Sequence, residues 1–128
     1  MKTILKNCKL ITPPFSEEKL YDIFIEGGLI ADIGENLHVE DAKELDLDGH
    51  VVLPGFIDMH CNICEPGFEN IEDISTVSRS AARGGFTSIT CEPNTKPVID
   101  NKTVVEYIIS KSKAQASVNI YPYGSMSM

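Results

Sequence analysis

The sequence lacks any apolar run that approaches the ~18 residues of a membrane-spanning helix. It also lacks the apolar stretch of a signal peptide, because Lys6 and Lys9 interrupt the N-terminal residues. Basic residues are few: 11 Lys and Arg stand against 19 Asp and Glu, a formal net charge of −8. Nucleic acids and anionic membranes bind clustered Lys and Arg, so neither is expected as a partner. We therefore predict a cytoplasmic protein.

A second C-x-x-C is also missing. The chain has four cysteines, and only Cys61 and Cys64 have this spacing. A single C-x-x-C is a weak zinc half-site, and Pro66-Gly67 prevents the helix that a redox motif would need. In a cytoplasmic chain we expect all four cysteines to be thiols.

The composition that remains is that of a globular protein. The 128 residues suffice for one ordinary domain, with 42% hydrophobic and 23% charged residues. Residues 1–53 have short strand patterns and two hairpin signals, Gly27-Gly28 and Asp48-Gly49. This first part predicts a small antiparallel β-sheet.

The pattern changes after Pro54 to an alternation of strands and helices. We predict strands over 55–62, 86–91 and 117–121, a helix over 72–83 that ends at Gly84-Gly85, and a second helix capped by Asp100 or Asn101. Ile71 is expected on the buried face of the first helix. Such alternation predicts parallel strands joined by right-handed crossovers. Three strands are too few to close a barrel, which takes eight.

Polar side chains alternate along the end of the first of these strands. Phe56 and Ile57 are expected to be buried, and the residues after them should share one face because strand side chains alternate. These residues are Asp58, His60, Asn62 and Cys64. A row of polar groups at the end of a buried strand is costly unless it lines a site.

A second polar stretch, from Cys91 to Asn94, follows the next strand. The carboxyl ends of parallel strands lie at one edge of the sheet, and sites form there. We therefore expect residues 60–64 and 91–94 to be neighbours.

The segment from Pro54 to Gly67 reads PGFIDMHCNICEPG. It resembles the metal motif of the amidohydrolase superfamily, and in particular that of the dihydroorotases, P-G-F-I-D-x-H-x-H-x-R-E-P-G. By this resemblance His60 matches the first metal-binding His, while Asn62 stands at the second. Cys64 stands where the family has an Arg that holds the substrate carboxylate, and Asp58 belongs to the frame and is expected to orient the strand end by hydrogen bonds.

A second dihydroorotase signature, P-N-T-x-P-x-x-D, is complete in Pro93-Asn94-Thr95 followed by Pro97 and Asp100. The resemblance gives Asn94 the role of binding the substrate carboxylate. It also implies the family fold, a (β/α)8 TIM-type barrel preceded by strands of a β-sandwich. On this basis residues 1–53 belong to the sandwich, and residues 54–128 to the first three strands of the barrel.

The resemblance implies a zinc-dependent hydrolase of pyrimidine biosynthesis that opens the cyclic amide dihydroorotate to N-carbamoyl-L-aspartate. It covers nearly all of these residues but only the first third of a full-length family member. The remaining ligands and the catalytic Asp come from later barrel strands, so we expect this chain to be inactive alone and to oligomerise or lack a C-terminal portion. The alternative is a non-catalytic, dihydroorotase-like scaffold partner of aspartate transcarbamoylase, which fits the replacements at Asn62 and Cys64.

Zinc binding by this chain is a separate question. An amide oxygen at Asn62 cannot replace an imidazole, since zinc prefers nitrogen and sulfur donors. A makeshift site of His60, Cys64 and Cys91 remains open, but one imidazole alone cannot hold zinc. We predict no stoichiometric zinc in this chain.

Overall fold

The computed structural model describes residues 1–12, 14 and 19–126. The chain divides into two compact units, Met1–Pro54 and Gly55–Met128, and each is described by itself. In the described part of the chain, no helix has the length and apolarity needed to cross a membrane.

The first unit is a five-stranded sheet with strand order β3-β2-β1-β4, in which β5 also pairs with β1. Its strands are β1 (Lys2–Leu10), β2 (Tyr21–Glu26), β3 (Leu29–Gly34), β4 (Lys43–Asp46) and β5 (Val51–Val52). The predicted hairpin at Gly27-Gly28 is confirmed: both glycines have positive φ, and β2 and β3 pair antiparallel on either side. Ile4, Cys8, Leu10 and Ile23 are its buried hydrophobic residues.

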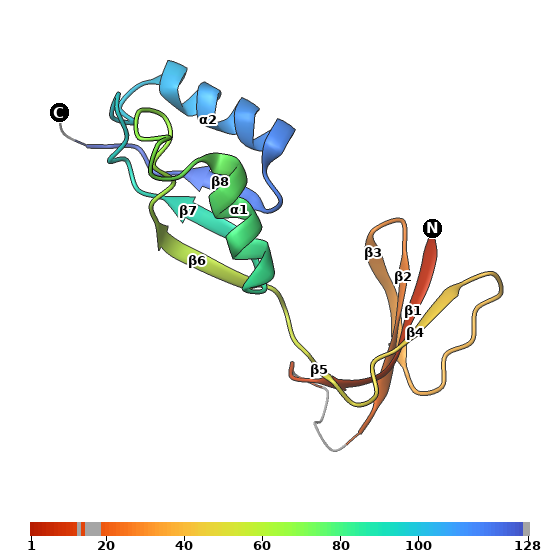
Figure 1. Cartoon of the computed structure of the whole chain (residues 1–128). Helices are drawn as coiled ribbons and strands as arrows, with labels where there is room; N and C mark the ends of the chain where they lie inside the picture. The colour runs from red at the N-terminus through yellow and green to blue at the C-terminus, as the bar shows by residue number, and fades with distance from the viewer. Residues whose placement is uncertain (13, 15–18, 127–128) are drawn as a thin grey trace. The chain divides into compact units, whose positions relative to one another are not determined.

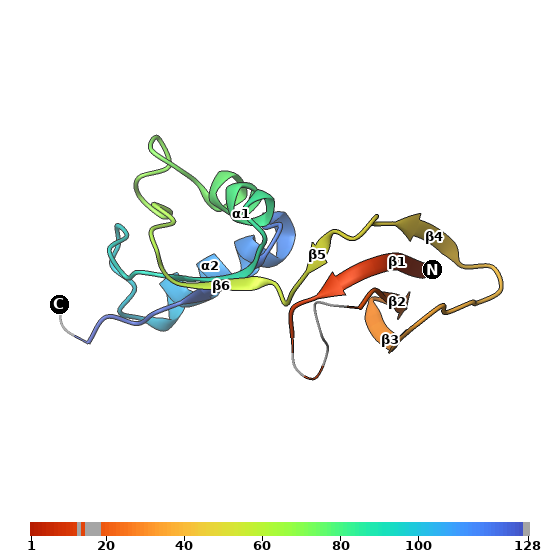
Figure 2. The same ribbon diagram turned by 90° about the horizontal axis from the view of Figure 1, so that it is seen from below.

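The second predicted hairpin, at Asp48-Gly49, is wrong. Asp48 and Gly49 do have positive φ, 47° and 76°, but β4 and β5 do not pair with each other. Both pair in parallel with β1, one after the other, as Figure 2 shows. The Gly49 N–H donates to the Asn7 carbonyl at 2.9 Å, and Asn7 itself has φ 58° within an irregularity of β1. The turn therefore follows a kink in β1, and the sheet is mixed rather than antiparallel throughout.

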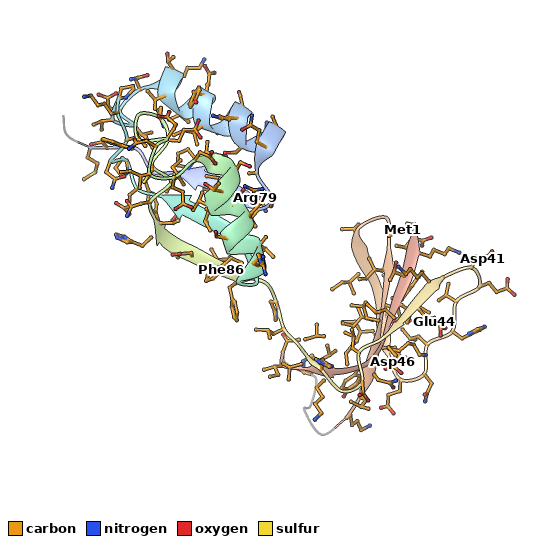
Figure 3. The ribbon with its side chains drawn as sticks, in the orientation of Figure 1. Met1, Asp41, Glu44, Asp46, Arg79 and Phe86 are labelled. Atoms are coloured by element: carbon orange, nitrogen blue, oxygen red, sulfur yellow. The ribbon has the colours of Figure 1, made fainter. Side chains whose placement is uncertain are left out.

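The buried carboxylate of Asp22 stabilises this kink in β1 by a hydrogen bond to the backbone of Asn7. Asp22 is 4% exposed and accepts from the backbone N–H groups of Asn7 at 3.0 Å and Leu37 at 2.9 Å. Lys6 Nζ lies 2.7 Å from the same carboxylate. The exposed side of this unit is acidic around β4, where Figure 3 labels Asp41, Glu44 and Asp46.

The second unit confirms the predicted parallel α/β arrangement. Its elements are β6 (Phe56–Cys61), α1 (Ile74–Arg83), β7 (Phe86–Cys91), α2 (Lys102–Gln115) and β8 (Asn119–Pro122). The sheet order is β6-β7-β8, and both pairings are parallel. Figure 1 shows β7 between the other two strands, with α1 and α2 beside them. This is the beginning of a TIM-type barrel.

Capping residues decide where the helices begin. The Asp73 carboxylate accepts from the Thr76 N–H at 2.7 Å, and the Thr76 hydroxyl accepts from the Asp73 N–H at 3.1 Å, a reciprocal cap that starts α1 at Ile74. Ile71 therefore precedes the helix and is 71% exposed, which corrects the expectation that it is buried. Asn101 caps α2 by accepting from the Thr103 and Val104 N–H groups.

The core of the second unit lies between the sheet and the helices, since α1 packs on β7 and α2 on β8. Its buried residues are Ile63, Ile74, Val77, Ile89, Cys91, Ile99, Val104, Ile108 and Ile120. Arg79, labelled in Figure 3, is on the exposed side of α1.

Phe56 and Ile57 were expected to be buried, and that prediction is wrong: they are 49% and 64% exposed. In the described chain β6 pairs with β7 alone, so it is an edge strand. Ile57 pairs with Ser88, whereas the next residue pairs with the buried Ile89, so Ile57 points away from the helices. Its side chain is therefore left largely exposed in the described part of this unit.

Candidate functional site

The ends of β6 and β7 are neighbours, as predicted from strand order alone. Cys61 and Cys91 are register partners, and the Glu92 N–H donates to the Cys61 carbonyl at 2.9 Å. Beyond this point both chains leave the sheet. The carboxyl edge therefore brings two polar stretches together.

The first contact across this edge joins the two asparagines. Asn94 Nδ2 donates to Asn62 Oδ1 over 2.5 Å. Both side chains are exposed, Asn62 directly after β6 and Asn94 in the loop after β7. Asn62, which the motif resemblance places at the second metal-ligand position, thus accepts a hydrogen bond from Asn94, which the resemblance expects to hold the substrate. A side-chain amide has two N–H groups, so one donor of Asn94 remains for a ligand.

The second contact joins His60 to the other strand. His60 Nδ1 lies 3.0 Å from Glu92 Oε1, and the His60 side chain is 81% exposed. The Asp58 carboxylate accepts from the His60 backbone N–H at 2.9 Å. Asp58 thus makes the expected hydrogen bond to the strand end. Glu92 contacts the imidazole ring, an interaction that reading the sequence missed, since nothing near His60 in the chain indicates it.

The cysteines are not arranged as a thiolate cluster. Strand β6 ends at Cys61, and Cys64 lies beyond it with φ 57°, so the alternation assumed for residues 58–64 stops before Cys64. Cys91 is fully buried in the core, and burial raises the pKa of its thiol to about 12. Residues 1–12, 14 and 19–126 contain no group of three or more His, Cys, Asp or Glu side chains placed to hold a metal ion. His60, Cys64 and Cys91 are therefore not brought together.

This donor set does not fit zinc. His60 is the one imidazole at the strand ends, the Asn62 oxygen already accepts a hydrogen bond, and Cys91 is a buried neutral thiol. Zinc sites take three or four nitrogen, sulfur or carboxylate ligands. The side chains at this edge bind one another instead, in the pairs His60–Glu92 and Asn62–Asn94.

Glu65 is the residue near the site whose role the sequence did not reveal. It is fully buried, only three positions after Asn62, in the loop that follows β6. Its carboxylate accepts from the Ile74 N–H at 3.0 Å, from the Tyr107 hydroxyl at 2.7 Å and from Lys111 Nζ. Burial pushes the pKa of Glu65 up, but these donors outweigh it and hold the pKa below its usual range.

One sequence signal was available. Tyr107 and Lys111 are four residues apart and therefore share a helix face, and that face meets the loop after β6. The pattern alone does not name the acceptor, because 42 and 46 positions separate the donors from Glu65.

Comparison with known proteins fits this geometry. A family model described as "Dihydro-orotase-like" matches residues 49–128. The dihydroorotase of Acetivibrio thermocellus is 45% identical over 124 residues, which cover 97% of this chain and 29% of that protein. The dihydroorotase of Geobacter sulfurreducens is also 45% identical, over 127 residues that cover 98% of this chain and 30% of that protein. The chain thus spans less than a third of the length of these relatives.

Solved structures that resemble this chain include two hydantoinases. The L-hydantoinase (dihydropyrimidinase) of Arthrobacter aurescens superposes with a TM-score of 0.84 at 28% identity, covering 95% of this chain and 27% of that one. A D-hydantoinase superposes with a TM-score of 0.71 at 26% identity, covering 95% and 26%. On the family match, the identities and the shared fold, the chain belongs to the dihydroorotase-like family of the amidohydrolase superfamily.

Proposed function

We propose that this chain supplies the N-terminal part of a dihydroorotase-like cyclic amidohydrolase, and that Asn94 binds the substrate carboxylate. Residues 1–53 would belong to the β-sandwich domain of such a protein, and residues 54–128 to its barrel. The observation that carries the proposal is the complete P-N-T-x-P-x-x-D loop at the carboxyl edge of the sheet, with Asn94 facing the end of β6. The family reaction opens dihydroorotate to N-carbamoyl-L-aspartate in pyrimidine biosynthesis, and the cytoplasm is its expected compartment.

The contribution of Asn94 is hydrogen bonding. One Nδ2 proton is used by Asn62, and the other is free to donate to a carboxylate oxygen. A hydrogen bond to a charged acceptor contributes about 1.5–3 kcal/mol, which orients a small ligand but does not bind it tightly. Cys64 stands at the position of the family Arg and adds no positive charge, so binding to this chain alone should be weak.

A titration tests this role without requiring catalysis. Dihydroorotate added to the ¹⁵N-labelled chain should shift the Asn94 side-chain amide signals together with the backbone amide signals of Glu92 and Thr95 on either side. Asn94→Asp has no side-chain amide, so the backbone signals are the readout there, and their response should be lost because a second carboxylate repels the first. Asn101→Asp is the matched control, since Asn101 caps α2 and an Asp retains that cap. A saturable response that persists in Asn94→Asp would contradict the assignment.

The chain by itself should not turn over dihydroorotate. Its strand ends do not offer a zinc ligand set, and the family places its further ligands and catalytic Asp on later strands. Proton transfer and a metal-activated water each contribute orders of magnitude to such rates. Pure, length-verified protein assayed with added zinc should give no turnover above the no-protein rate. Metal-dependent turnover would contradict this prediction.

The second candidate is a non-catalytic scaffold partner of aspartate transcarbamoylase. The pairing of Asn62 with Asn94 favours it, because this pair occupies a position where the family has a ligand and a substrate contact. Size-exclusion chromatography with purified aspartate transcarbamoylase separates the candidates. Co-elution that survives Asn94→Asp would favour the scaffold.

A further inference from the structure

Glu65 joins three separate segments of the second unit. Its carboxylate binds the N-terminus of α1 through the Ile74 N–H, and it binds two side chains one turn apart on α2, Tyr107 and Lys111. A fully buried carboxylate is tolerated only when it is paired and hydrogen-bonded, and here three donors meet that requirement. The N-terminus of a helix adds a favourable dipole for the negative charge.

The loop that carries Glu65 also contacts the loop that carries Asn94. The Lys96 N–H donates to the Pro66 carbonyl at 2.8 Å. Gly67 has φ 105°, and a Cβ atom there would stand 2.2 Å from the Lys96 carbonyl oxygen. The two loops therefore pack backbone against backbone, two residues from Asn94.

The α2 helix completes the connection. The Asn94 loop leads into Asn101, the cap of α2, and the same helix presents Tyr107 and Lys111 to Glu65. The segments thus form a closed ring: the loop after β6, helix α2, and the loop after β7. Asn62 starts the first loop, and its contact with Asn94 lies where the ring meets the sheet.

We propose that Glu65 is a positioning residue for the ligand-binding edge: by anchoring the loop after β6 to both helices, it holds Asn94 against Asn62. The proposal rests on the proposed function only in taking Asn94 as a ligand-binding residue, since the contact between Asn62 and Asn94 exists without substrate. Glu65 touches no reacting group. Its effect passes through Pro66 and Lys96 to Asn94.

The test reads the Asn62–Asn94 contact directly. In the ¹⁵N-labelled chain, the Asn94 Nδ2 protons should show a downfield hydrogen-bonded shift and a nuclear Overhauser effect to the Asn62 side chain. In Glu65→Gln the equilibrium constant for this contact should fall about tenfold, the factor that corresponds to the loss of one ordinary hydrogen bond. The amide signals of Ile89 and Ile120 in the parallel sheet report that the unit remains folded.

Glu106→Gln is the matched control. Glu106 lies on the same helix and forms an exposed pair with Lys102 at 3.4 Å, so its loss should leave the Asn94 signals unchanged. Tyr107→Phe removes one of the three donors to Glu65 and should move the Asn94 signals part of the way towards those of Glu65→Gln. This variant also decides the matter if Glu65→Gln fails to fold.

The proposal is overturned if Glu65→Gln, or Tyr107→Phe in its place, melts at a lower temperature while the Asn94 signals remain those of the unaltered chain. That result would make Glu65 a purely structural residue. Failure of the proposed function is distinct from this outcome. It would appear as an unchanged Asn94 signal on addition of dihydroorotate, whatever the Glu65 variants do.

Discussion

Zinc binding can be judged quantitatively from the burial of one thiol. A makeshift site would need His60, Cys64 and Cys91, and zinc binds the thiolate rather than the thiol. The pKa of Cys91 is raised to about 12, five units above pH 7. At 1.36 kcal/mol per unit, deprotonating Cys91 costs about 7 kcal/mol at neutral pH. Zinc-finger sites with four ligands bind with about 10–16 kcal/mol at pH 7, and that figure already includes deprotonation of ordinary thiols. The excess for Cys91 over an ordinary thiol with a pKa of 9.0 is three units, or about 4 kcal/mol, which is roughly a third of such an affinity.

The assay is equilibrium dialysis at pH 7 with zinc in excess, followed by metal analysis of protein whose intact mass has been verified. We expect much less than one zinc per chain. Any weak binding should strengthen as pH rises, because thiolate formation releases protons. One zinc per chain at pH 7, lost in Cys64→Ser or His60→Ala but kept in the control Cys61→Ser, would refute the reasoning and establish the makeshift site.

Three further outcomes are expected. Asp22→Asn should lower the free energy of unfolding of the first unit by about 3 kcal/mol in urea denaturation, because it breaks the ion pair with Lys6 and places an amide NH₂ against one of the two backbone N–H groups that Asp22 accepts from; an unchanged midpoint would contradict the role of Asp22. Burial opposes ionisation of Asp22 and Glu65, but Lys6, Lys111 and the other donors outweigh it and lower both pKa values. The stabilisation that these carboxylates give is therefore complete above the unfolded carboxyl pKa of about 4 and is lost as pH falls below it. The urea midpoint should be lower at pH 3 than at pH 7, and equal midpoints would contradict this. The open edges of the β6-β7-β8 sheet and its exposed apolar side chains, among them Ile57, Met59 and Tyr121, should drive self-association, and a monomer at high concentration in light scattering would count against this.

Local signals in the sequence were sufficient for most of the second unit. Apolar periodicity located the helices and the strand Phe86–Cys91, and Gly84-Gly85 marked the end of α1, where Gly85 adopts φ 84°. The alternation of strands with helices predicted parallel pairing, and parallel pairing places the carboxyl ends of β6 and β7 next to each other. The motif around His60 and Asn94 then identified the family. Such features can be predicted because they depend on backbone preference and residue spacing within a short window.

The partners of distant groups could not be predicted in this way. Asp48 and Gly49 have the positive φ angles of a hairpin turn, but the two flanking strands, β4 and β5, both pair in parallel with β1 instead of with each other. Cys91 could have faced a metal or the core, and helix packing on β7 placed it in the core.

The sequence by itself determined the family, the order of the parallel strands and the edge where the candidate site lies. Only the tertiary structure decided that Asn62 binds Asn94, that Glu92 contacts His60, and that Glu65 collects its donors from both helices. The physical reason is that a side chain's hydrogen-bond partner and its exposure to water depend on segments that are distant in the chain. Spacing along the sequence fixes which face a residue occupies, but not which group it meets there.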